Sequence, residues 1–302
     1  MSENKFAILI DSTGDLTKEL REKYDIDYCA MSVNIDGKDV VASLDYDQGY
    51  SLKDFADYMR GGKRIFTAQV SQEEFSKKFK EHLDKGEDII YLACSGKLSK
   101  SVDFGRLIAD KLKGEYPERK IFVVDSLISC IGQGGLAMMA SDLRSEGKSI
   151  EEVVAWLEEN KLKMNQFATV ENLTWLKRAG RVSAGSAFFG NIIGIKPIII
   201  SDTLGHNFAV KKVKGKKPSW IEVAESLLAS VEDVKKYPIY IGDFDNVEGA
   251  DFIADYIKQK APEATIVRVP IGPIIGASCG PAVIGAFTFG KKVTVTGGDA
   301  TK

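Results

Sequence analysis

The sequence predicts an α/β protein of two domains, in which a parallel sheet with helices on both faces is followed by a second, mixed α/β domain. Short apolar runs at residues 6–10, 89–94 and 121–124 each end in a polar turn and lead toward a helical segment. This alternation of strands and helices is typical of a parallel sheet. The chain has 302 residues, about twice the length of a common domain. We therefore expect one domain over residues 1–160 and another over residues 161–302.

The other elements follow from similar signals. A strand over residues 28–35 runs into Asp36-Gly37, a dipeptide typical of a hairpin turn. Ser149 and Glu152 have the spacing of a capping box, which predicts a helix through residue 162 that bridges the domains. Further helices are expected at residues 51–60, 173–179 and 247–260 and from residue 220, and further strands at residues 166–170, 196–200, 239–242 and 265–269.

The composition is that of an ordinary soluble globular protein. Hydrophobic residues make up 44% of the chain and charged residues 28%, and 41 basic side chains face 43 acidic ones. This balance gives no indication of a nucleic-acid partner. The first residues lack a secretory signal, so we expect a cytoplasmic protein. Residues 269–290 are uncharged, but their three prolines and five glycines argue against stable membrane insertion.

We expect neither a metal site nor a cofactor. The cysteines contain no C-x-x-C pair and are interpreted as free buried thiols. They are Cys29, Cys94, Cys130 and Cys279. His82 and His206 lie outside any metal-spacing motif and are each given mostly a surface role. The glycine-rich motifs that cradle nucleotide phosphates are absent from the sequence.

Serines gather in the turn after the apolar run at residues 89–94. Ser95 and Gly96 end the predicted strand, and Ser99 and Ser101 follow. Open α/β sheets bind ligands at the carboxyl ends of their strands, where the next helix also presents unpaired N–H groups. The turn therefore suits an anion, and Ser95, Gly96 and Ser99 are candidate ligand-binding residues. The alternative is that Ser99 or Ser101 only caps the next helix.

Two other turns carry candidates. Thr67 and Gln69 lie in the approach to a helix and have no evident capping role, so we expect them to face a ligand at the sheet edge. Ser126 follows the apolar run at residues 121–124 and is a third candidate. Ser71, by contrast, precedes a glutamate at capping-box spacing and is interpreted as structural.

Three features of the second domain have two interpretations each. Arg181, just past a glycine that ends a helix, either pairs with an acidic ligand or forms a salt bridge within the protein. The basic run at residues 211–217 is either a solvated surface loop or a patch that docks a partner. The stretch 188–195 either lines a ligand tunnel or belongs to the ordinary core.

Seven segments, specific in their order and spacing, carry a resemblance to a known family. They are IDSTGDL, FTAQVSQEEF, ACSGKLSKS, VVDS, ENLTWLKRAGRVS, NIIGIKPII and GASCGP. They resemble the DegV family of bacterial fatty-acid-binding proteins over essentially the whole chain. The resemblance implies a two-domain fold with a long-chain fatty acid between the domains and its carboxylate near Thr67 and Ser95. It also implies a carrier without catalytic residues, which presents the acid to a partner fatty acid kinase for acyl phosphate formation.

The chain departs from the family pattern at two places. Ala68 and Val70 replace the serine and proline of the usual T-S-Q-P-S segment. Ser278 stands where the family usually has a histidine in G-A-H-x-G-P, so a hydroxyl must serve there. The second departure bears on partnership with a kinase more than on lipid binding.

Other function classes stay open at this point. A serine-dependent enzyme would use Ser95 or Ser99 as nucleophile, but no G-x-S-x-G elbow is present and the two histidines are poorly placed. A nucleic-acid-binding protein would use the basic run at residues 211–217. A divergent member of the family would bind another acidic ligand.

Overall fold

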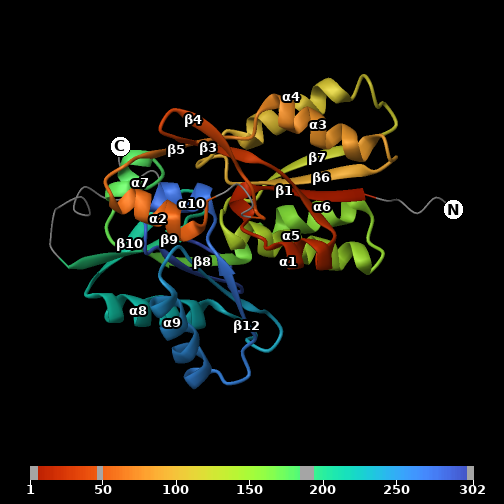
Figure 1. The fold of residues 1–302 in the computed structure, drawn as a ribbon. Coiled ribbons are helices and arrows are strands. Elements are labelled where there is room, and N and C mark those ends of the chain that lie inside the picture. The colour runs from red at the N-terminus through yellow and green to blue at the C-terminus, as the bar shows by residue number, and fades with distance from the viewer. Residues whose placement is uncertain (1–5, 46–49, 184–193, 298–302) are drawn as a thin grey trace.

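The computed structural model describes residues 6–45, 50–183 and 194–297 (Figure 1). These residues form a four-stranded, a six-stranded and a three-stranded sheet, together with their helices. The α/β class predicted from the sequence is confirmed.

The four-stranded sheet is wholly parallel, with strand order β2-β1-β6-β7. Its strands are β1 (Phe6–Asp11), β2 (Ile26–Cys29), β6 (Asp88–Ala93) and β7 (Ile121–Asp125). Helices α3 (Gln72–Leu83) and α4 (Ser101–Leu112) cover one face, and α1 (Lys18–Tyr24), α5 (Ile131–Ser145) and α6 (Ile150–Asn160) lie on the other (Figure 1). Strands β1 and β6 are buried along their whole length, as expected when helices cover both faces. The predicted parallel sheet is therefore confirmed.

The prediction of one strand over residues 28–35 is wrong. Strand β2 ends at Cys29, and β3 (Met31–Ile35) begins a separate antiparallel sheet of order β4-β3-β5. Its partners are β4 (Lys38–Ala42) and β5 (Ile65–Ala68), and α2 (Leu52–Arg60) lies between them in sequence. The Ser12 hydroxyl stabilises the change of sheet, because it accepts from Met31 N at 2.9 Å and donates to Ala42 O at 2.7 Å. The turn at Asp36-Gly37 is confirmed, with φ of 49° and 82° as a type I′ hairpin requires.

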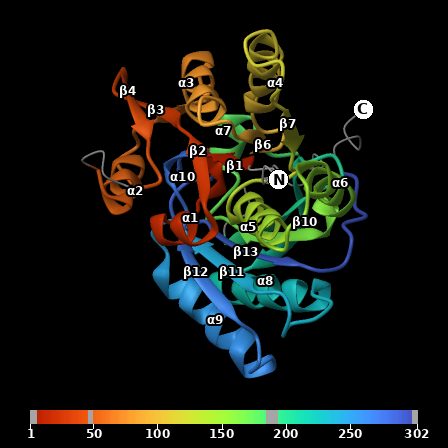
Figure 2. The ribbon, with the colours of Figure 1, turned by 90° about the vertical axis from the view of Figure 1, so that its right-hand side faces the viewer.

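The six-stranded sheet is mixed, with order β10-β9-β8-β13-β11-β12. Its strands are β8 (Met164–Thr169), β9 (Ile195–Ser201), β10 (Asn207–Lys214), β11 (Ile239–Asp243), β12 (Ile266–Pro270) and β13 (Ile284–Phe289). Helices α8 (Lys216–Ser230) and α9 (Val247–Lys260) cover its outer face, whereas α5 lies between this sheet and the parallel one (Figure 2). The short helices α7 (Thr174–Ala179) and α10 (Pro273–Cys279) and the 3-10 turns η1 (Ser12–Gly14) and η2 (Lys161–Lys163) join these layers.

The basic run at residues 211–217 is not a loop. Strand β10 continues through Lys214, and α8 begins at Lys216. Because β10 is an edge strand, its long charged side chains can reach solvent without leaving the sheet. Lys211 forms an ion pair with Glu222 at 2.7 Å. The run therefore includes a paired lysine and belongs to regular structure.

The uncharged segment at residues 269–290 contains the end of β12, helix α10 and strand β13. Within the described ranges, no helix combines the length and the apolar character that crossing a membrane requires. The capping box at Ser149 is confirmed: its hydroxyl accepts from Glu152 N at 3.2 Å, and the Glu152 carboxylate accepts from Ser149 N at 2.8 Å.

One hydrophobic cluster runs from Phe6 to Phe289 and includes residues of all three sheets. A second cluster lies beneath α8 and α9. Since the first cluster crosses residue 160, the division into domains at that position stays a prediction.

Candidate functional site

A cavity of about 370 Å³ lies where the sheets meet. Strands β8 and β13 supply one wall through Gln166, Ala168, Gly285 and Phe287, and α10 supplies another. Its larger apolar lining residues are Met31, Leu98, Leu176, Ile271, Ile274, Ile275, Val283 and Phe287. Its polar lining residues are Thr13, Thr67, Gln69, Ser99, Lys100, Ser129, Gln166, Arg181, Asn207 and Ser278. A cavity of this size, apolar with a set of polar groups, is typical of a small-molecule site.

Four of the candidate residues line this cavity together with Gln69: Thr67, Ser99, Arg181 and Ser278. Thr67 comes from β5, and Ser278 from α10, where its hydroxyl donates to Ile274 O at 3.1 Å. The Arg181 Nε donates to Leu98 O at 3.1 Å, and no acidic partner is found for this guanidinium among the described residues. Within the described ranges, the charge of Arg181 is therefore not paired with a carboxylate, and it lies at the cavity.

Ser95, Gly96 and Ser126 are not among the lining residues. The Ser95 hydroxyl donates to Gly205 O at 2.8 Å, and the Ser126 hydroxyl donates to Ile128 O at 2.9 Å. Gly96 N donates to the Asp125 carboxylate at 3.2 Å. These three residues shape the loops behind the cavity, and Ser95 joins the parallel sheet to the turn between β9 and β10.

The capping alternative for the serine turn is wrong. Lys100 is the N-cap residue of α4, and it makes no side-chain capping hydrogen bond. Ser99 instead accepts from Ser101 N at 3.2 Å, so it supports the turn from one residue earlier. Ser71 caps α3 as predicted. The capping box is not completed, because the Glu74 carboxylate accepts from Ala30 N at 3.0 Å.

A buried carboxylate network behind the cavity was not predicted. Asp11 is fully buried and accepts hydrogen bonds from Tyr91 Oη at 2.8 Å and Cys94 N at 3.0 Å. It also accepts from Thr13 N at 3.0 Å, and the Thr13 hydroxyl lies 2.6 Å from Gln133 Oε1. The network fixes Thr13 and Cys94, which both line the cavity. The sequence signal was the polar turn after β1, but none of its partners lies nearby in sequence.

A second buried acid adjoins the cavity at Cys130. Asp15 is fully buried, and its Oδ1 accepts from Gly272 N at 2.9 Å. Burial raises the pKa of Asp15 to about 7, against the hydrogen bonds from Cys130 and Gly272. Burial also raises the pKa of the Cys130 thiol. This cavity-facing thiol is therefore protonated and weakly nucleophilic at neutral pH.

The prediction of free thiols is confirmed. Three of the four cysteines are buried, and Cys279 is half-buried; Cys94, Cys130 and Cys279 line the cavity. No group of three or more possible metal ligands is found in the part of the chain that the structure describes.

A basic basin of about 190 Å³ adjoins the cavity. It shares Thr67, Arg181 and Ser278 with the cavity and adds Arg64 and Arg178. Its aromatic residues are Phe66 and Trp175; the Arg64 guanidinium lies 4.7 Å from the Phe66 ring and that of Arg178 lies 5.7 Å from the Trp175 ring. No acidic residue is found among the described residues that line the basin. An anion would therefore be attracted to this side of the cavity.

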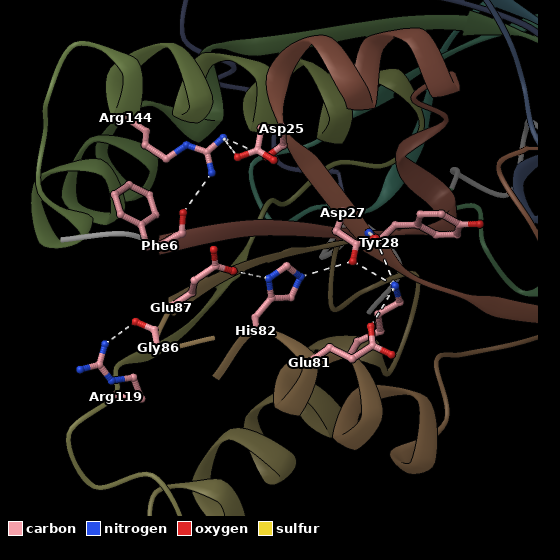
Figure 3. Close-up of polar contacts among 11 residues, drawn as sticks. Phe6, Asp25, Asp27, Tyr28, Glu81, His82, Gly86, Glu87, Arg119 and Arg144 are labelled. Carbon is pink, nitrogen blue, oxygen red and sulfur yellow. Dashed lines mark hydrogen bonds and ion pairs between the residues drawn. The ribbon is translucent and has the colours of Figure 1, made fainter. Parts of the chain in front are cut away.

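The surface role predicted for His82 is wrong. Its side chain is 12% exposed, and Nδ1 lies 2.7 Å from Glu87 Oε2 while Nε2 lies 3.3 Å from Asp27 Oδ2 (Figure 3). The hydrogen bond with Asp27 raises the pKa of His82. This network lines a separate polar groove at the amino ends of β1 and β2. His206 lies in the turn before β10, so neither histidine lines the cavity, and no serine–histidine pair is formed there.

The tunnel-lining interpretation of residues 188–195 falls mostly on residues 184–193, which lie outside the described residues. Ile195 begins β9.

An α/β protein with a cavity of small-molecule size where its sheets meet is the class that this fold and site define. Residues 5–291 match the model described as "Uncharacterised protein, DegV family". A DegV domain-containing protein of Clostridium perfringens is 34% identical over 288 residues, which cover 95% of this chain and 98% of that protein. The chain therefore belongs to the DegV family, and the resemblance seen in the sequence segments is confirmed.

Solved structures of the family have the same fold. A DegV lipid-binding protein from Thermotoga maritima is 25% identical, with a TM-score of 0.84 over 96% of this chain and 100% of the other. A DegV family protein from Thermus thermophilus, described by its fatty acid binding, is also 25% identical, with a TM-score of 0.84 over 95% of this chain and 99% of the other.

Proposed function

We propose that this protein binds a long-chain fatty acid in the cavity where its sheets meet, and that it acts in the cytoplasm as a carrier without a catalytic step of its own. The observation that carries the proposal is the cavity of about 370 Å³, in which eight large apolar residues adjoin a cationic side. The lipid-binding and fatty-acid-binding relatives of the same fold support it.

In this proposal the carboxylate lies toward Thr67, Arg181 and Ser278, the residues that the cavity shares with the basic basin. Burying about fourteen methylenes at about 0.8 kcal/mol each contributes on the order of 11 kcal/mol before the costs of binding. A charge-assisted hydrogen bond adds only about 1.5 to 3 kcal/mol. The apolar walls therefore set the affinity, and the polar side sets which end of the ligand faces the basin.

The basin is the place from which a partner would reach the carboxylate. We propose that the partner is a fatty acid kinase and that the two domains, residues 1–160 and 161–302, present the acid to it for acyl phosphate formation. Arg64 and Arg178 support an anionic reactant on this side. Ser278 replaces the usual family histidine with an uncharged hydroxyl, whose single hydrogen must turn from Ile274 O to the carboxylate in order to bind it.

Calorimetric titration of delipidated protein with saturated acids of increasing length tests the binding step. We expect one site per chain and an affinity that rises with each methylene until the cavity is filled. Adding a fatty acid kinase and ATP to the loaded protein then tests the presentation step, with acyl phosphate as product. Binding without phosphorylation would support the carrier function and contradict the partnership with a fatty acid kinase.

A divergent member that binds another acidic ligand is the second candidate, because ten polar residues line the cavity. The same titration separates the two: no measurable uptake of any fatty acid, with a folded protein, would favour a more polar acid.

A further inference from the structure

Two amide side chains are buried against the cavity. Gln166 of β8 is 6% exposed and Asn207 at the start of β10 is 9% exposed, and both line the cavity. The cross-strand neighbour of Gln166 is Phe287 of β13, which is 2% exposed and lines the same wall. A polar side chain thus lies beside an apolar one in this wall of the cavity.

The hydrogen bonds of this pair determine which way each amide points. Asn207 Nδ2 donates to Arg181 O at 3.1 Å, and a main-chain carbonyl can only accept. Asn207 Oδ1 must therefore point the other way, where it accepts from Gln166 Nε2 at 3.2 Å. The Gln166 amide is oriented in turn, with its nitrogen toward Asn207 and its oxygen away from it.

The side-chain oxygen of Gln166 is the second feature of this amide, because it points away from Asn207. Its hydrogen bond to Asn207 uses one N–H of the amide; among the described residues, no donor to Gln166 Oε1 and no acceptor for the second N–H is found, and the side chain faces the cavity. Removing a buried amide from water without a partner is unfavourable, and a hydrophobic wall does not relieve that cost. An unbranched acyl chain passing this point would bury both groups against methylenes.

We propose that Gln166 is a specificity-determining residue that selects an acyl chain bearing a hydroxyl group. A hydroxyl donates to Oε1 and accepts from the remaining N–H, so it satisfies both free positions at once. A carbonyl on the chain only accepts, and a methylene does neither. The inference rests on the proposed function, since it concerns the chain of the fatty acid held in this cavity, and it narrows the ligand from fatty acids to hydroxy fatty acids.

Competition binding with full-length, delipidated protein tests the proposal without any variant. The probes are stearic acid, its 3-, 10-, 12- and 18-hydroxy derivatives and its 10- and 12-keto derivatives. Several positions are used because the experiment also determines which carbon of the chain lies beside Gln166. We expect one hydroxy isomer to bind about five- to tenfold more tightly than stearic acid and more tightly than the corresponding ketone. If no hydroxy isomer exceeds stearic acid, the proposal is overturned, and a bound water satisfies Gln166 instead. If no probe binds at all, it is the proposed function that fails.

Gln166→Met then assigns the preference to this residue, because methionine has nearly the same shape and no amide. We expect the ratio of the affinities for the preferred hydroxy acid and for stearic acid to fall to about one. Thr169→Val is the matched control, since Thr169 lies on the same strand, is buried and has an unpartnered hydroxyl, but does not line the cavity. Loss of the preference in the control, or its persistence in Gln166→Met, would contradict the role of Gln166. Should Gln166→Met fold poorly, Asn207→Leu, which removes the acceptor of Gln166 Nε2 and so no longer fixes the orientation of the Gln166 amide, must reduce the same preference.

Discussion

Replacing Ala168 with leucine should shorten the acyl chain that the protein prefers. Ala168 lies on β8 in the wall of the cavity, opposite Gly285 of β13. Leucine adds three carbon atoms there, which displace about three methylenes of the ligand. At about 0.8 kcal/mol per methylene the loss is about 2.4 kcal/mol, or roughly a 50-fold weaker affinity for the longest chain.

The assay is titration of the delipidated Ala168→Leu variant with saturated acids from twelve to eighteen carbons, beside the original protein. We expect the length at which affinity stops rising to fall by about three carbons, while shorter acids bind nearly as before. Thr169→Val, one residue along and outside the cavity, should leave the length dependence unchanged. An unchanged length dependence in a folded Ala168→Leu variant would refute the placement of the chain against this wall.

The remaining predictions concern the polar groups. Thr67→Val should weaken binding of the acid by roughly 10- to 100-fold, the loss of a charge-assisted hydrogen bond, but should change binding of the fatty alcohol much less; equal losses for both ligands would show that Thr67 does not contact the carboxylate. His82→Gln should lower the free energy of unfolding by about 1 kcal/mol at pH 6 and by less at pH 9. The raised pKa of His82 beside Asp27 gives stabilisation that is present below about pH 6.5 and is lost as the pH rises through the pKa of the folded state. Urea unfolding at both pH values measures this, and a larger difference between variant and original protein at pH 9 than at pH 6 would contradict it. Asp15→Asn should become more stable relative to the original protein as the pH rises from 4 to 7, because Asp15 ionises above pH 3.8 in the unfolded state but stays protonated up to about pH 7 in the folded state. A difference in the free energy of unfolding that is constant with pH would argue against a protonated Asp15.

The parallel sheet could be predicted because its strands are buried on both faces and so appear as unbroken apolar runs. The runs ending near Ile10 and Ala93 are examples, and both strands are fully buried. The division at Ala30 could not be predicted in this way. Residues on both sides of it have the composition of a strand, and the change of sheet depends on the Ser12 hydroxyl, which lies 19 residues before Met31.

The candidate site was predicted only as far as local patterns allow. Hydroxyl residues at strand ends were identified, but the partner of the Ser95 hydroxyl is Gly205 O, 110 residues away. No local pattern distinguishes that serine from Thr67, which faces the cavity. Gln166 was missed because residues 166–170 were predicted only as a strand, with no face assigned to its side chains. Gln166 and Ala168 are two residues apart on β8 and so lie on the same face, and both line the cavity.

Denaturing organic extraction of the purified protein, followed by mass spectrometry of the extract, tests the central claim most directly. The proposed function predicts about one fatty acid per chain, and the further inference predicts that hydroxylated chains are enriched over their share of the host lipids. An empty extract from a folded protein that also takes up no added fatty acid would contradict the carrier function.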